Sequence, residues 1–97
     1  FLDHVNAVAA TLEQGVKTLI QEFPAIFVEA RGRGLMQGVK LADAIVNRDF
    51  KTELEGEGLL VAPAGDNVLR LLPPLIVTDQ HVVEAMAIFA TVAKRHA

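Results

Sequence analysis

The sequence predicts an α+β domain, a small antiparallel sheet with helices on one face. Apolar residues recur at helical spacing at both ends of the chain, and short runs of two-residue alternation lie between these ends. Turns that contain glycine or asparagine separate the short runs, and tight turns of this kind join antiparallel strands. With 97 residues the chain has room for one modest core, so we expect a single domain over 1–97.

The first helix is expected over residues 1–23, because Pro24 cannot continue it. The large apolar residues that follow one face of this helix are Phe1, Val5, Val8, Leu12, Val16, Leu19, Ile20 and Phe23. Alternation over 26–31 and again over 35–41 then predicts two strands of a hairpin. The first strand is expected to show Ile26, Val28 and Ala30 on one side, and Phe27, Glu29 and Arg31 on the other.

The connection between these strands contains Gly32 and Gly34, which are expected to provide positive φ angles at a tight or bulged turn. The segment is only weakly similar to a phosphate loop, because a dinucleotide fingerprint needs a third glycine and a following helix. Asp43 is expected to cap a second helix, which buries Val46, Phe50 and Leu54 and ends near 56–58.

Two further strands are expected over 59–62 and 68–72, joined through the turn residues 65–67, with a proline after each strand. Thr78 is the predicted N-cap of the last helix, with Val77 placed to pack against Val82. The residues that this helix is expected to bury are Val82, Met86, Phe89 and Ala93. Its final Lys94 and Arg95 suit the negative end of the helix dipole.

Charge and hydropathy exclude several classes of function. The net charge is −3 and the basic residues are scattered, so no nucleic-acid partner is expected. No apolar run reaches the ~18–20 residues of a membrane span, so no membrane association is expected. Cysteine is absent, which removes disulfides and thiolate chemistry and is typical of a cytoplasmic protein.

Residue types limit the chemistry further. Serine is absent as well as cysteine, so neither a Ser–His–Asp nor a Cys–His arrangement can form. His81 and Glu84 share a helix face, but two ligands are fewer than the three that zinc takes from a protein, so no metal site is expected. The charged residues expected to be simply solvated are Lys17, Lys51, Glu53, Glu55, Glu57 and Lys94.

The chain carries more apolar residues than an isolated domain needs. They make up 52% of it before the seven glycines are counted, against ~45–50% with glycine in an ordinary soluble domain. This surplus predicts a surface that meets a partner. The sequence also opens at Phe1 directly in a helical pattern, and we therefore expect it to be a piece of a longer chain.

Arg70 is the one residue whose position indicates a binding role. It interrupts an otherwise apolar strand, where an ionised guanidinium is costly unless a carboxylate or another anion meets it. Alternation puts Leu69 and Leu71 on one face and Arg70 on the other, which is expected to be the open face of the sheet. A structural ion pair and a carboxylate-binding role remain equally open at this point.

Three motifs together resemble a known family. Arg-Gly-Arg-Gly-Leu-Met-Gln-Gly-Val over 31–39, Gly-Leu-Leu-Val-Ala-Pro-Ala over 58–64 and Gly-Asp-Asn-Val-Leu-Arg-Leu-Leu-Pro-Pro-Leu-Ile-Val over 65–77 occur in the order and spacing of class III, pyridoxal-phosphate-dependent aminotransferases. The resemblance covers nearly the entire chain and is to the C-terminal small domain of these fold type I enzymes. Within the family it is most similar to the branch that uses N2-acetylornithine.

The resemblance implies a homodimeric enzyme that transfers the amino group of N2-acetyl-L-ornithine to 2-oxoglutarate, in arginine biosynthesis. Pyridoxal 5'-phosphate would be bound by a missing N-terminal large domain, which would also supply the Schiff-base lysine. No catalytic and no cofactor-binding residue is therefore expected in this chain, which should be inactive alone. Arg70 matches the family arginine that binds a substrate carboxylate, while 31–34 matches a segment that is mainly architectural.

Three alternatives stay open. One is a free-standing regulatory module that binds an amino acid through Arg70. Another is a dimerisation module without a ligand, since a fold does not determine a function. The third is a class III aminotransferase for a different substrate, such as ornithine or succinylornithine.

Overall fold

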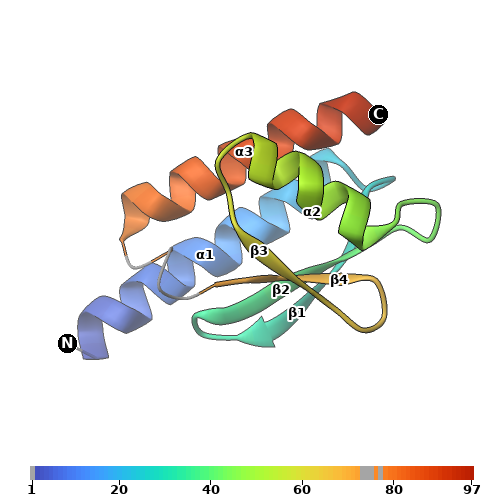
Figure 1. Ribbon diagram of the computed structural model, residues 1–97. Helices are drawn as coiled ribbons and strands as arrows, with labels where there is room; N and C mark the ends of the chain where they lie inside the picture. Colours follow the sequence, from blue (N-terminus) through green and yellow to red (C-terminus); the bar gives the residue numbers. More distant parts are fainter. Residues whose placement is uncertain (1, 73–75, 77) are drawn as a thin grey trace.

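The structure, a computed structural model, describes residues 2–72, 76 and 78–97. The elements follow the expected order and are α1 (Leu2–Glu22), β1 (Phe27–Arg33), β2 (Met36–Leu41), α2 (Asn47–Gly56), β3 (Val61–Ala64), β4 (Val68–Leu71) and α3 (Asp79–His96). The strands form one antiparallel sheet in the order β1-β2-β4-β3, and the three helices lie together on one side of it (Figure 1). The predicted α+β class with helices on one face is thereby confirmed.

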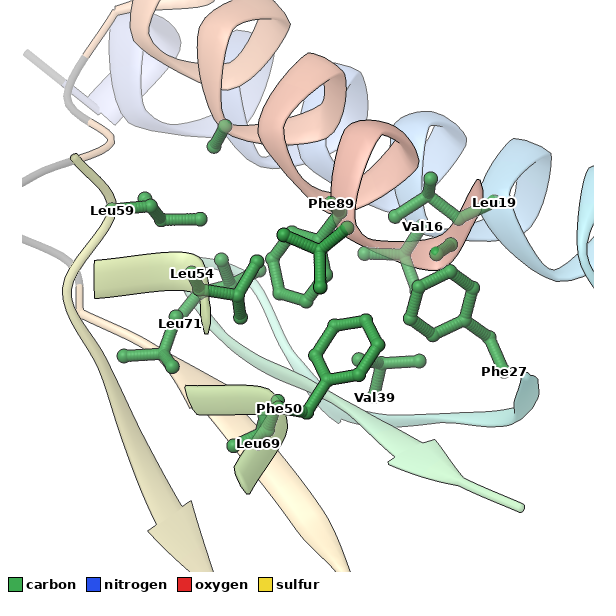
Figure 2. Packing of buried hydrophobic residues seen from close by; sticks show 14 of the residues in the cluster. Val16, Leu19, Phe27, Val39, Phe50, Leu54, Leu59, Leu69, Leu71 and Phe89 are labelled. Atoms are coloured by element: carbon green, nitrogen blue, oxygen red, sulfur yellow. The ribbon is translucent and has the colours of Figure 1, made fainter. Parts of the chain in front are cut away.

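The core lies between the helices and the sheet. Figure 2 shows the rings of Phe27, Phe50 and Phe89 meeting there, one from the sheet and one from each of α2 and α3. Phe27 contacts each of the other two edge-on, with ring centroids 5.8 Å apart in both pairs. α1 adds an unbroken buried stripe consisting of Val8, Leu12, Val16 and Leu19, as its periodicity predicted. The expected contacts of Phe1 and Val77 fall outside the described residues.

The strand β1 departs from simple alternation. Its register with β2 shifts between Phe27 and Glu29, a β-bulge that lets Phe27 and the preceding Ile26 both be buried. The prediction that Phe27 shares a face with Glu29 was wrong, because the extra residue, Val28, resets the alternation and is itself exposed. The glycine turn is confirmed, with φ angles of +86° at Gly32 and +58° at Gly34.

The start of α2 was also predicted incorrectly. The helix begins at Asn47 after Val46, which is 55% exposed rather than buried, and Asp43 makes no cap. The cap comes from a distant turn instead, because Asn67 Oδ1 accepts the Asn47 N–H at 2.9 Å. Asn67 Nδ2 also donates to backbone carbonyls at residues 42 and 45, at 3.1 and 2.6 Å. The predicted burial of Phe50 is confirmed.

The last two strands and α3 agree more closely with expectation. β3 begins two residues later than predicted and continues through Pro63, which an edge strand tolerates because its outer N–H is not needed. Thr78 caps α3 as predicted, its hydroxyl accepting the His81 N–H at 3.1 Å. Val82, Phe89 and Ala93 are buried, whereas Met86 is only partly so. No helix in the described residues combines the length and apolarity that crossing a membrane requires.

Candidate functional site

Arg70 lies where the alternation of β4 predicts. Its neighbours Leu69 and Leu71 are buried under the helices, while Arg70 is exposed on the opposite, open face of the sheet. Across the sheet it is in register with Gly38 of β2 and Ala62 of β3. One neighbour has no side chain and the other only a methyl group, which leaves Arg70 exposed.

Gly38 is fixed by the close approach of β4. A Cβ at this position would lie 2.7 Å from the backbone oxygen of Leu69 and 3.4 Å from the Cα of Arg70. No side chain fits there without moving the strands apart. A cavity of about 450 Å³ occupies this part of the open face, with Arg31, Met36, Gly65 and Val68 also among the residues that line it.

Arg70 makes no hydrogen bond or ion pair with another residue in the described ranges 2–72, 76 and 78–97. Its planar guanidinium therefore keeps five N–H donors available. That geometry matches a carboxylate, which accepts two parallel hydrogen bonds from such a group. Within the described residues the geometry thus favours an external anion over a structural ion pair.

A second arginine stands in the same row of the sheet. Arg31 of β1 is in register with Gly38, so the row reads Arg31, Gly38 and Arg70 across three strands. Unlike Arg70, it is paired: its Nη2 donates to Asp66 Oδ2 at 2.7 Å and to Glu29 Oε2 at 3.1 Å. These hydrogen bonds, first that of Asp66 and then that of Glu29, raise the pKa of the Arg31 guanidinium.

Asp66 is shared between two cations. Besides Arg31 it accepts a hydrogen bond from Lys40 Nζ at 3.0 Å. The Arg31 hydrogen bond first, and then that of Lys40, hold the pKa of the Asp66 carboxyl below its ordinary value, so it is ionised at neutral pH. Neither Arg31 nor Asp66 was predicted as a member of this site. Arg31 was interpreted as a strand residue and Asp66 as a turn residue, and only the strand register brings them together.

Several other charged groups form ion pairs on the helical layer. Of the residues expected to be simply solvated, Glu53 and Glu57 instead connect α2 to α3, through His96 at 2.6 Å and Arg95 at 2.8 Å. The exposed pairs that lie within single helices are Lys17 with Glu13 and Lys51 with Glu55. Among the described residues no three metal-ligating side chains gather at one place.

Comparisons with known proteins decide the family. The family profile described as Aminotransferase class-III matches residues 1–93, which is nearly the whole chain. The chain belongs to the class-III aminotransferases. Class-III aminotransferases are pyridoxal-phosphate-dependent transferases, as the three sequence motifs implied.

Two curated relatives are named acetylornithine aminotransferase. The protein from Mesorhizobium japonicum is 44% identical over 86 residues, which cover 89% of this chain and 21% of the relative. That from Brucella melitensis is 39% identical over 95 residues, covering 98% of this chain and 23% of the relative. This class-III chain thus spans between a fifth and a quarter of the length of these relatives.

Solved structures of the same family share the fold. An N-acetylornithine aminotransferase from Stenotrophomonas maltophilia superimposes with a TM-score of 0.81 at 31% identity, over 97% of this chain and 26% of that one. An ornithine δ-aminotransferase from Plasmodium falciparum gives a TM-score of 0.81 at 25% identity, over 95% of this chain and 24% of that one. Aminotransferase structures named for different substrates therefore match this fold about equally well.

The side chains present do not by themselves form a pyridoxal-phosphate site. The cofactor needs a lysine for its Schiff base, and none of the four lysines lines the cavity. Lys17, Lys40 and Lys51 are in ion pairs, and Lys94 lies at the end of α3. What this class-III chain offers is an unpaired guanidinium, that of Arg70, at a cavity of about 450 Å³.

Proposed function

We propose that this chain is the C-terminal small domain of an acetylornithine aminotransferase. In this proposal the intact enzyme transfers the amino group of N2-acetyl-L-ornithine to 2-oxoglutarate, and Arg70 binds a substrate carboxylate. The observation that carries the proposal is the unpaired Arg70, exposed beside Gly38 on the open face of a class-III domain. The chain alone is expected to be inactive, because pyridoxal phosphate and its lysine would belong to a separate, N-terminal large domain.

Further support comes from the way the two layers differ. The helical layer closes the core, and in the part of the chain that the structure describes all the helices lie on that side of the sheet (Figure 1). The opposite face carries the cavity and the free guanidinium of Arg70. Such a face suits contact with the large domain, so that the substrate is enclosed between the two. We also propose that the intact enzyme is a homodimer of the cytoplasm, acting in arginine biosynthesis.

Ornithine is the principal alternative amino donor. The likeness to the Plasmodium falciparum ornithine δ-aminotransferase structure favours keeping it, because that fold match equals the match to the N-acetylornithine enzyme. The residues described here bind a carboxylate, a group that both amino donors and 2-oxoglutarate possess. Discrimination at the far end of the donor must then come from residues outside this chain.

The full-length product of the gene tests the proposal. Its intact mass and its visible absorption are measured before and after addition of N2-acetylornithine, with ornithine as the matched donor. We expect a chain several times the length of this domain, with a visible absorption of bound pyridoxal phosphate that N2-acetylornithine depletes more efficiently than ornithine does. Faster depletion by ornithine would instead indicate that ornithine is the amino donor.

A mature chain of 97 residues without visible absorption would overturn the aminotransferase proposal. A free-standing module would then remain, and glutamate binding would separate its two forms. Detectable binding indicates a regulatory amino-acid module, whereas a tight dimer without binding indicates a dimerisation module.

A further inference from the structure

Of the two arginines that line the cavity on the open face, Arg31 is paired and Arg70 is not. Around the cavity, Arg31 and Lys40 are held by Asp66 and Glu29, at N···O distances of 2.7–3.1 Å. Arg70 alone among the cavity-lining cations has no acidic partner among the described residues. The other arginine of this face, Arg33, lies two residue pairs further along the hairpin than Arg31, opposite Met36, and does not line the cavity.

The position of the acids matters as much as their number. Arg31 shares its row with Arg70, with only Gly38 between them. Both acids that hold Arg31 lie toward the β3–β4 turn. Glu29 is in the same row as Lys40 and Val68, and Asp66 lies in the turn just before Val68. The ion pairs therefore draw the Arg31 guanidinium along the sheet, away from the row that it shares with Arg70.

The turn fixes Asp66 in this position. Its backbone is left-handed, with φ 62°, and so is that of the next residue, Asn67, with φ 59°. The Asn67 side chain is anchored by hydrogen bonds to α2 and to the segment before it. A left-handed non-glycine residue carries strain, and here the anchored turn maintains it. The Asp66 carboxylate is thus positioned by the fold.

We propose that Asp66 is a specificity-determining residue of the open face: by sequestering Arg31 and Lys40 it leaves Arg70 as the one free cation among the described residues that line the cavity, so that the cavity accepts a single carboxylate. Anions with two closely spaced negative charges gain nothing from Arg31 in this arrangement. The inference rests on the proposed function, in which Arg70 binds a substrate carboxylate. Its physical basis is that a paired guanidinium offers less charge and fewer donors to a ligand than a free one.

Inhibition of the full-length enzyme by two simple anions tests this. Malonate carries two closely spaced carboxylates and acetate carries one, and each is measured as a competitive inhibitor against 2-oxoglutarate. In Asp66→Asn the malonate inhibition constant is expected to fall about fivefold, the size of one exposed charge interaction, while that of acetate changes less than twofold. Asparagine tolerates the left-handed backbone at this turn, and exposed ion pairs contribute little to stability, so the variant is expected to fold.

A substitution of Arg31, the other partner in the ion pair, distinguishes an effect of charge placement from a merely structural effect. In Arg31→Gln the acids Glu29 and Asp66 lose a cation, so malonate inhibition should weaken. Signs that are opposite in Asp66→Asn and Arg31→Gln support the proposal. Weaker malonate inhibition in both variants, or no change in Asp66→Asn, overturns it. Glu57→Gln, which removes an exposed partner of Arg95 on the helical layer, is the matched control and should leave both inhibition constants unchanged.

The same inhibition assay distinguishes a failure of the role proposed for Asp66 from a failure of the carboxylate-binding role proposed for Arg70. If Arg70→Lys leaves both the KM for 2-oxoglutarate and the acetate inhibition constant unchanged, Arg70 does not bind the carboxylate and the assignment of the site fails. If Arg70→Lys raises both but Asp66→Asn leaves the ratio of malonate to acetate inhibition constants unchanged, only the role of Asp66 fails.

Discussion

Single residues in this domain are predictable to the extent that their environment is local. Arg70 could be identified from five residues of sequence, because alternation alone places it opposite two buried leucines. Arg31 and Asp66 could not, since they are separated by 35 positions and meet only through the pairing of three strands. The capping role of Asn67 could not be predicted either. Its sequence neighbourhood indicates a turn, but the helix that it caps begins 20 positions earlier in the chain.

The role of Arg70 can be tested by a conservative substitution. Arg70→Lys keeps the charge but loses the two parallel hydrogen bonds, so we expect kcat/KM for 2-oxoglutarate in the full-length enzyme to fall roughly tenfold to a hundredfold, the value of about 1.5–3 kcal/mol for hydrogen bonds to charged groups. Arg33→Lys is the matched control, on the same face but away from the cavity. Equal kinetics for wild type and Arg70→Lys would remove Arg70 from the substrate site.

At the level of elements, the periodicity of the sequence predicted every helix and strand, because each period is a property of a contiguous segment. The errors lie at the ends and at one irregularity. The bulge after Phe27 and the start of α2 at Asn47 both depend on contacts with other elements, namely the core and the β3–β4 turn. The β1–β2 hairpin, in contrast, is governed by its own glycines.

That hairpin yields a prediction with an internal control. A Cβ on Gly32 would lie 1.9 Å from the backbone oxygen of Met36, at a φ of +86°, whereas a Cβ on Gly34 meets nothing within 4 Å at a φ of +58°. Gly32→Ala is expected to lower the free energy of unfolding by about 3 kcal/mol, from strain and overpacking together, and Gly34→Ala by about 1 kcal/mol. Urea denaturation followed by far-UV circular dichroism measures both, and equal losses would contradict the register of the hairpin.

In the whole molecule, the helices bury an apolar core against one face of the sheet, and the other face is open and polar. Sequence patterns predicted that the helices share one face, but not the strand order, because β2 pairs with β4 across the intervening α2 and β3. Within residues 2–72, 76 and 78–97 the expected apolar surplus does not gather on the open face. The large apolar side chains exposed in these ranges are spread over α1, both hairpins, the N-cap of α2 and α3, and comprise Leu2, Val28, Met36, Val46, Leu60 and Val83.

The core between the helices and the sheet predicts which substitutions lower the free energy of unfolding. Phe50 of α2 is fully buried and contacts Phe27 of the sheet and Phe89 of α3, with ring centroids 5.8 and 6.4 Å away (Figure 2). Phe50→Ala should lower the free energy of unfolding by about 3–5 kcal/mol, since it removes a ring at the meeting point of all three elements. Val46→Ala, four residues earlier, should cost less than about 0.5 kcal/mol, because Val46 is exposed.

Urea denaturation compares the two variants under the same conditions. If Phe50→Ala leaves too little folded protein to measure, Phe50→Leu preserves most of the apolar volume and should cost about 1–1.5 kcal/mol. Comparable losses for Val46→Ala and Phe50→Ala would mean that α2 buries Val46 as the sequence pattern suggested. Its face against the sheet would then differ from the one described, and with it the cap that Asn67 provides to Asn47.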